Sequence, residues 1–244
     1  MIKNILLIAG HGDGDPGAID NGYQEADLTR EMAQLIKPHL DKYVNVDIFD
    51  MTKDMYKYLN TGHTFNFKTY DYVVEIHLNS TLQPLPEDEK TTGSEILIHE
   101  LERGSTVEEK ILENLEALGL KNRGIKPVSN LLVMNTCKRK QGVSHALIEI
   151  CFIKDADDMK IYASKKEEIA KAITNGIVDG FGLEAKDLGL QDISGHYAED
   201  YIKDLYDLGI VKGDGNGNYK PDEALKRGDA AILIRNAIKY ITGK

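Results

Sequence analysis

The stretch NILLIAGHGDGDPGA at residues 4–18 decides how the rest of the chain is interpreted. An apolar run, typical of a buried strand, leads directly into a loop that contains four glycines and one histidine, His11. Such a loop could be a phosphate cradle, a tight turn or part of a metal site. Residues elsewhere in the chain must distinguish these three interpretations.

Short apolar runs bounded by Gly, Asp or Asn recur along the chain and predict strands. They lie at residues 2–9, 45–49, 71–76, 95–99, 131–134 and 146–152. Segments with helical spacing alternate with several of them, and this alternation is typical of an α/β domain. We therefore expect residues 1–183 to form an α/β fold with a mixed, mainly parallel sheet of about six strands, flanked by helices.

Two stripes of apolar residues have the spacing of amphipathic helices. The first contains Leu28, Met32, Leu35 and Ile36, and the second contains Val107, Ile111, Leu115 and Leu118. Ser105 with Glu108, and Ser164 with Glu167, match the capping-box pattern, so we expect a helix to begin at each serine.

The sequence changes character after residue 183. Residues 184–191 are expected to form a linker, and residues 192–244 a small helical module with helices at 198–208 and 227–241. About fifty residues bury little core by themselves, so this module is expected to associate with something else.

Composition narrows the functional classes. The chain has 244 residues and a formal net charge of −10, without a long basic run, which argues against nucleic-acid binding. No apolar run approaches the roughly 20 residues of a membrane-spanning helix, so no membrane insertion is expected. The first residues lack the pattern of a signal peptide, so we expect synthesis in the cytoplasm.

Two cysteines, Cys137 and Cys151, cannot form a disulfide framework and are expected to be free, buried thiols.

Four polar residues stand where predicted strands or helices begin or end, or within an apolar run. His11 follows the first strand, Glu25 begins the first helix on its inward stripe, His77 ends the strand DYVVEIH, and Glu149 interrupts the apolar run HALIEICF. Two histidines and a carboxylate are a ligand set of catalytic zinc, and a further glutamate can serve as general base. Ligands gather at strand ends in open α/β sheets, so these residues could meet.

Each residue also has a simpler explanation. His11 could be an ordinary surface residue, and Glu25 could favour the positive end of a helix. Glu149 is harder to explain in this way, because an unpaired buried carboxylate costs several kcal/mol. A phosphate cradle is disfavoured, because the loop matches neither common phosphate motif and its aspartates would repel phosphate.

Taken together, the motifs resemble a known family. AGHGDGDPGA, Glu25, EIHLNS, TTGSEILIH, KNRGIKPVSNLLVMN and ALIEICFIKDADD are similar to successive motifs of zinc-dependent N-acetylmuramoyl-L-alanine amidases of the amidase-3 type, especially those of clostridial phage endolysins. The resemblance implies that His11, Glu25 and His77 bind Zn²⁺ and that Glu149 is catalytic. This sequence departs from the family at Glu75, where serine is common, and at Asp155, where asparagine is common.

The C-terminal residues resemble one surface-layer homology repeat, through HYA at 196–198, GI at 209–210, YKP at 219–221 and KRGD at 226–229. The resemblance implies binding of a secondary cell-wall polysaccharide, with Arg227 as the candidate contact, because a guanidinium can hold both oxygens of a carboxylate. Lys226 replaces the usual threonine. A calcium loop at GDGNGNY is disfavoured because the EF-hand spacing is absent. Such repeats commonly pack in threes, so a single copy predicts association between chains.

The function implied is that of an endolysin: hydrolysis of the amide between N-acetylmuramic acid and L-alanine in the peptidoglycan of a Gram-positive host, at the cell wall after the membrane is breached. Three alternatives stay open. They are a host autolysin of the same family, a zinc peptidase that cuts within the stem peptide, and a non-enzymatic wall-binding protein.

Overall fold

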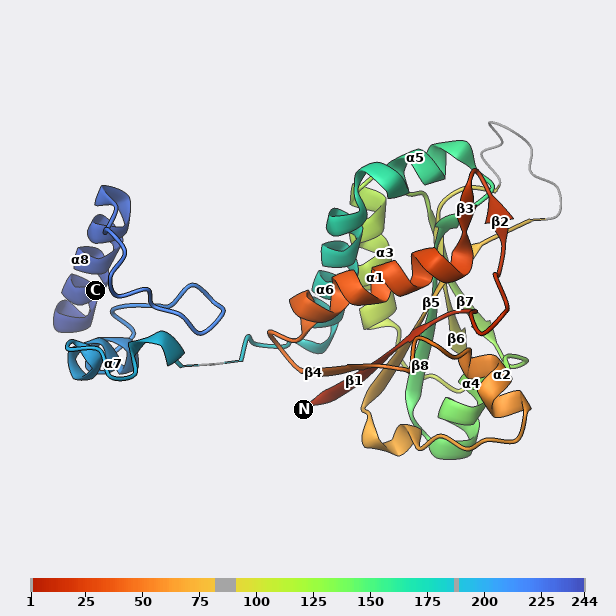
Figure 1. The fold of residues 1–244 in the computed structure, drawn as a ribbon, viewed down its shortest axis with the longest axis horizontal. Helices are drawn as coiled ribbons and strands as arrows, with labels where there is room; N and C mark the ends of the chain where they lie inside the picture. Colours follow the sequence, from red (N-terminus) through yellow and green to blue (C-terminus); the bar gives the residue numbers. More distant parts are fainter. Residues whose placement is uncertain (1, 82–90, 187–188, 244) are drawn as a thin grey trace. The chain divides into compact units, whose positions relative to one another are not determined.

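The computed structural model describes residues 2–81, 91–186 and 189–243 (Figure 1). Its contacts divide the chain into two units, Met1–Glu184 and Ala185–Lys244, which are described separately. Residues 187 and 188, within the expected linker, lie outside the described residues. No helix in the described ranges is both long and apolar enough to cross a membrane.

A six-stranded sheet forms the centre of the first unit, in the order β4-β1-β5-β8-β6-β7. Neighbouring strands are parallel except for β8 and β6, which are antiparallel. The α/β fold with a mixed, mainly parallel sheet is therefore confirmed. The strands are β1 (Asn4–Ala9), β4 (Asn45–Ile48), β5 (Tyr72–Asn79), β6 (Ser94–His99), β7 (Asn122–Val128) and β8 (Ser144–Phe152), and a small hairpin pairs β2 (Ile19–Asp20) with β3 (Tyr23–Gln24).

Helices cover both faces of this sheet (Figure 1). One face packs against α1 (Glu25–Leu40), α3 (Thr106–Ala117) and α6 (Lys166–Phe181), with α5 (Ala156–Ser164) before α6. The other face is covered by α2 (Met55–Asn60), the 3-10 helix η1 (Phe67–Thr69), α4 (Leu132–Met134) and the π-helix η2 (Asn135–Lys140). Cys137 and Cys151 are buried free thiols, as expected.

One strand prediction was wrong. Residues 131–134 form no strand, because Val133 and Met134 bury their side chains from the short helix α4. The strand that completes the sheet is β7, which pairs with β6 and with no other strand in the part of the chain that the structure describes. Its residues are mostly half-buried, so they lack the continuous apolar run that marks a central strand.

Ser105 is the N-cap residue of α3, so the predicted helix start there is confirmed, whereas the helix start predicted at Ser164 was wrong, and neither serine forms a capping box. The Ser105 hydroxyl donates to Glu109 Oε1 at 2.6 Å, while Glu108 turns into the core and accepts from the Tyr72 hydroxyl at 2.5 Å. Ser164 is the last residue of α5, where its hydroxyl donates to the Lys160 carbonyl at 2.8 Å, and α6 begins at Lys166.

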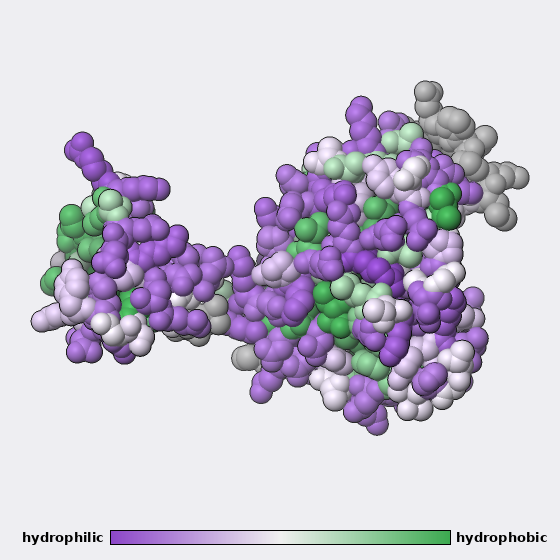
Figure 2. All heavy atoms as spheres, in the orientation of Figure 1, coloured by the Kyte–Doolittle hydropathy of each residue, from purple (hydrophilic) through white to green (hydrophobic). Residues whose placement is uncertain are grey.

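The second unit contains η3 (Gln191–Ile193), α7 (Glu199–Asp207) and α8 (Arg227–Thr242), close to the two helices predicted there. None of the residues of α8 is buried. Figure 2 shows hydrophobic side chains on the surface of this helix. The most exposed large apolar residues of the unit are Tyr197, Tyr201, Leu225, Ile232, Ile234, Tyr240 and Ile241.

Candidate metal centre

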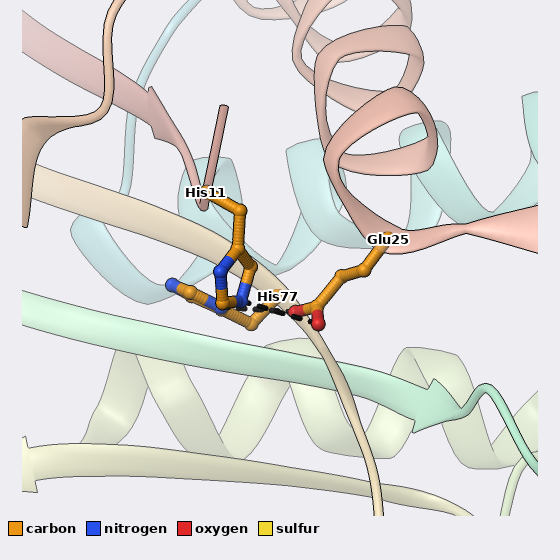
Figure 3. A group of neighbouring side chains, drawn as sticks. All are labelled: His11, Glu25 and His77. Atoms are coloured by element: carbon orange, nitrogen blue, oxygen red, sulfur yellow. Dashed lines mark hydrogen bonds and ion pairs between the residues drawn. The ribbon is translucent and has the colours of Figure 1, made fainter. Parts of the chain in front are cut away.

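His11, Glu25 and His77 come from three separate segments and meet at one end of the sheet (Figure 3). His11 lies in the loop after β1, Glu25 is the first residue of α1, and His77 lies near the end of β5. One potential ligand atom from each residue lies within 4.8 Å of the others. The structure therefore brings together the three side chains that the sequence singled out for zinc.

The Glu25 carboxylate contacts both imidazoles, whose rings also pack edge to face against each other. Its Oε2 lies 3.1 Å from His11 Nε2, and its Oε1 lies 3.0 Å from His77 Nδ1. The backbone N–H groups of Ala18 and Leu78 each donate to this carboxylate at 3.0 Å. Burial opposes its ionisation, but the hydrogen bonds with His11 and His77 outweigh burial and hold the pKa of Glu25 well below its usual range.

The pKa values of the two histidines shift in the opposite direction to that of Glu25. Burial favours the neutral rings, but the nearby carboxylates outweigh burial and raise the pKa of both His11 and His77. His11 also has Asp15 Oδ2 at 3.2 Å from its Nδ1. A metal binds neutral imidazole, so a cation at this site would displace protons that the two rings otherwise hold.

Two glycines have no side chain at positions where a Cβ atom would overlap the metal-site residues. A Cβ on Gly10 would lie 2.3 Å from His77 Cε1, so only glycine allows the ring to lie against the end of β1. A Cβ on Gly17 would lie 2.7 Å from both Glu25 Oε2 and His11 Cδ2, and Gly17 also has a φ of +65°. The glycine-rich loop is therefore shaped around the histidine and the glutamate.

Glu149 lies on β8 opposite His77 in the strand pairing, and Glu95 on β6 pairs with Glu149 from the other side. The Oε2 atom of Glu149 is buried and has no hydrogen-bond partner within the described residues. Burial raises the pKa of Glu149 to about 7; the charges of Glu25, Glu95 and Glu75 add to this, and His77 opposes it. A carboxylate with this pKa suits proton transfer near neutral pH.

A cavity of about 340 Å³ opens beside the cluster. His11 and His77 line it together with Glu75, Tyr56, Asp54, Asn130 and residues 131–133. The cluster can therefore be reached by a ligand. Two imidazoles and one carboxylate within reach of one another, beside a buried glutamate with an unpaired oxygen, fit a zinc site of the catalytic kind.

Three polar groups near the cluster were not predicted as site residues from the sequence. Glu75 and His145 form a buried pair with 2.9 Å between Oε2 and Nε2. Glu95 accepts hydrogen bonds from Arg123 at 2.7 Å, from Asn79 at 3.0 Å and from Lys126. Strand alternation places Glu75 and His77 on one face, but their cross-strand partners depend on a register that the sequence does not give. Arg227, the candidate wall contact, is the exposed first residue of α8 in the second unit.

Comparison with known proteins gives two matches to family profiles. Residues 5–179 match N-acetylmuramoyl-L-alanine amidase, and residues 191–231 match the S-layer homology domain. The first match covers more than half of the chain.

Individual relatives resemble different extents of the chain. A probable autolysin of Staphylococcus aureus is 27% identical over 197 residues, which cover 73% of this chain but 38% of that protein. The endolysin of Bacillus phage SPP1 is 26% identical over 278 residues, covering 100% of this chain and 99% of the endolysin. The solved catalytic domain of the CD27L endolysin targeting Clostridia difficile has 24% identity and a TM-score of 0.57, covering 73% of this chain and 98% of that domain, and supports the fold.

Proposed function

Because this chain belongs to the N-acetylmuramoyl-L-alanine amidase family, we propose that it hydrolyses the amide between N-acetylmuramic acid and L-alanine in peptidoglycan. The observation that carries this proposal is the cluster of His11, Glu25 and His77 with Glu149 on the adjacent strand. The phage SPP1 endolysin matches this chain over nearly its full length, which supports an endolysin acting on a Gram-positive wall over an autolysin.

His11, Glu25 and His77 would hold Zn²⁺. When bound, zinc supplies a Lewis acid for the amide carbonyl and acidifies a water molecule. Glu149 then accepts a proton from the attacking water and delivers it to the departing nitrogen of L-alanine, because its carboxylate is buried and its pKa is near neutral. Glu25 keeps its negative charge throughout, since its hydrogen bonds favour the ionised form.

The two family matches support a division of roles between the two parts of the chain. Residues 1–183 would carry catalysis, residues 184–191 would be a linker, and residues 192–244 would bind secondary cell-wall polysaccharide. Arg227 is the proposed contact for a carboxylate of that polymer, because its guanidinium is exposed at the start of α8.

Copies of the second unit would also associate, as a trimer. Ile232 and Ile234 are 62% and 58% exposed, and none of the residues of α8 is buried within one chain. Association would cover this apolar surface. Light scattering at micromolar concentration tests the point, and a strict monomer that still binds walls would contradict it.

One assay separates the proposed reaction from its alternatives. The protein is incubated with purified Gram-positive walls, and the newly exposed groups are identified. New L-alanine amino termini without new reducing ends support the amidase. Amines that appear elsewhere in the stem peptide would indicate a peptidase, and no new groups at all would indicate a wall-binding protein without catalysis.

A further inference from the structure

Glu75 is a buried carboxylate beside the metal cluster, on the same face of β5 as His77. Its Oε1 lies 3.3 Å from His77 Nε2, and its Oε2 lies 2.9 Å from Nε2 of His145 on β8. Glu75 is 6% exposed and His145 is fully buried. A buried carboxylate is costly unless it is hydrogen-bonded, so its place between two imidazoles requires an explanation.

The two ring nitrogens of His77 have different neighbours. Nδ1 faces Glu25 at 3.0 Å, within the cluster, whereas Nε2 faces Glu75. A neutral imidazole has one N–H and one lone pair, and the partner of the N–H decides which nitrogen offers the lone pair. With Glu75 as acceptor at Nε2, the lone pair of His77 is left on Nδ1.

His145 holds Glu75 in turn. Its Nε2 lies against Glu75 Oε2, and its buried Nδ1 has no hydrogen-bond partner within the described residues. A neutral ring with its single proton on Nε2 satisfies Glu75 and leaves Nδ1 as an unpaired acceptor, which costs less than an unpaired donor.

We propose that Glu75 is a positioning residue that fixes His77 with its proton on Nε2 and its Nδ1 lone pair directed to the metal, and that His145 anchors Glu75. This inference rests on the proposed zinc site. Partners of metal-bound histidines of this kind typically change metal affinity by 10–100-fold when they are removed.

The experiment measures the affinity of the full chain for Zn²⁺ alone, by competition with a chromophoric chelator. Glu75→Gln keeps the size of the side chain but leaves one acceptor oxygen for two donors, and we expect its zinc dissociation constant to rise about tenfold. Glu108→Gln is the matched control, because Glu108 is equally buried and hydrogen-bonds Tyr72 away from the cluster. Its zinc affinity should equal that of the wild type.

Two further measurements keep the proposal testable if Glu75→Gln does not fold. ¹⁵N NMR of the zinc-loaded wild type should show His77 protonated at Nε2. His145→Leu should weaken zinc binding, whereas His145→Gln, which retains an N–H donor, should restore most of it. A folded Glu75→Gln with wild-type affinity, or a His77 proton on Nδ1, overturns this inference alone. A wild-type chain that binds no zinc overturns the proposed metal site as well.

Discussion

His77 and Glu149 lie directly opposite one another in the parallel pairing of β5 with β8. This register places a candidate ligand and a candidate proton acceptor side by side on a rigid sheet, although they are far apart in the sequence. Because neighbouring strands are about 4.8 Å apart, a small group bound by His77 would lie within reach of the Glu149 carboxylate. The strand pairing therefore places the residue proposed to bind the cation next to the residue proposed to move the proton.

Replacing the proton acceptor should separate these two roles. In Glu149→Gln we expect amide hydrolysis to fall by about 10²–10⁴-fold, because the amide cannot accept the proton of the attacking water. Zinc content, measured by elemental analysis after gel filtration, should stay at the wild-type level, since Glu149 is not among the three clustered ligands. Wild-type turnover in Glu149→Gln would contradict the assignment.

The pH dependence should report the same carboxyl group. Glu149 must be ionised to accept a proton; in the metal-free site burial raises its pKa from 4.5 to about 7, and a bound cation lowers this pKa again. We therefore expect kcat/KM to fall as the pH decreases through this pKa, about tenfold per pH unit. Glu95→Gln removes a neighbouring negative charge that raises this pKa, so the acidic limb should move to lower pH. An unchanged limb in Glu95→Gln would argue that another group titrates.

The sequence predicted the elements that bear the cluster better than the contacts around it. Glu25 was expected to begin the first helix on its inward side, and it does so with 3% of its surface exposed. The edge strand β7 was missed because it pairs on one side only and lacks an apolar run. The contact of Glu75 with His145 could not be predicted, because it depends on the register between β5 and β8.

Gly10 gives a steric test of the site. In Gly10→Ala the new Cβ would lie 2.3 Å from His77 Cε1, and the backbone there is held by hydrogen bonds from Thr29 and Arg30 to the Gly10 carbonyl. The ring must therefore shift, and we expect zinc affinity to fall at least about tenfold. Gly104→Ala is the control, because its Cβ would meet nothing within 4 Å. Equal zinc affinity in both variants would show that the position of His77 is not restricted by Gly10.

Arg227 allows wall attachment to be tested apart from catalysis. A charge-assisted hydrogen bond contributes about 1.5–3 kcal/mol, so Arg227→Ala should weaken binding to purified walls roughly 10–100-fold. Hydrolysis of a soluble muropeptide that carries no wall polymer should stay unchanged, and so should the melting temperature, because the side chain is exposed. Lys239→Ala is the matched control, since it removes the same charge from an exposed position of the same helix. If both variants lose wall binding equally, the second unit is held by overall charge and Arg227 makes no specific contact. If Arg227→Ala alone loses it, the guanidinium recognises an anionic group of the polymer.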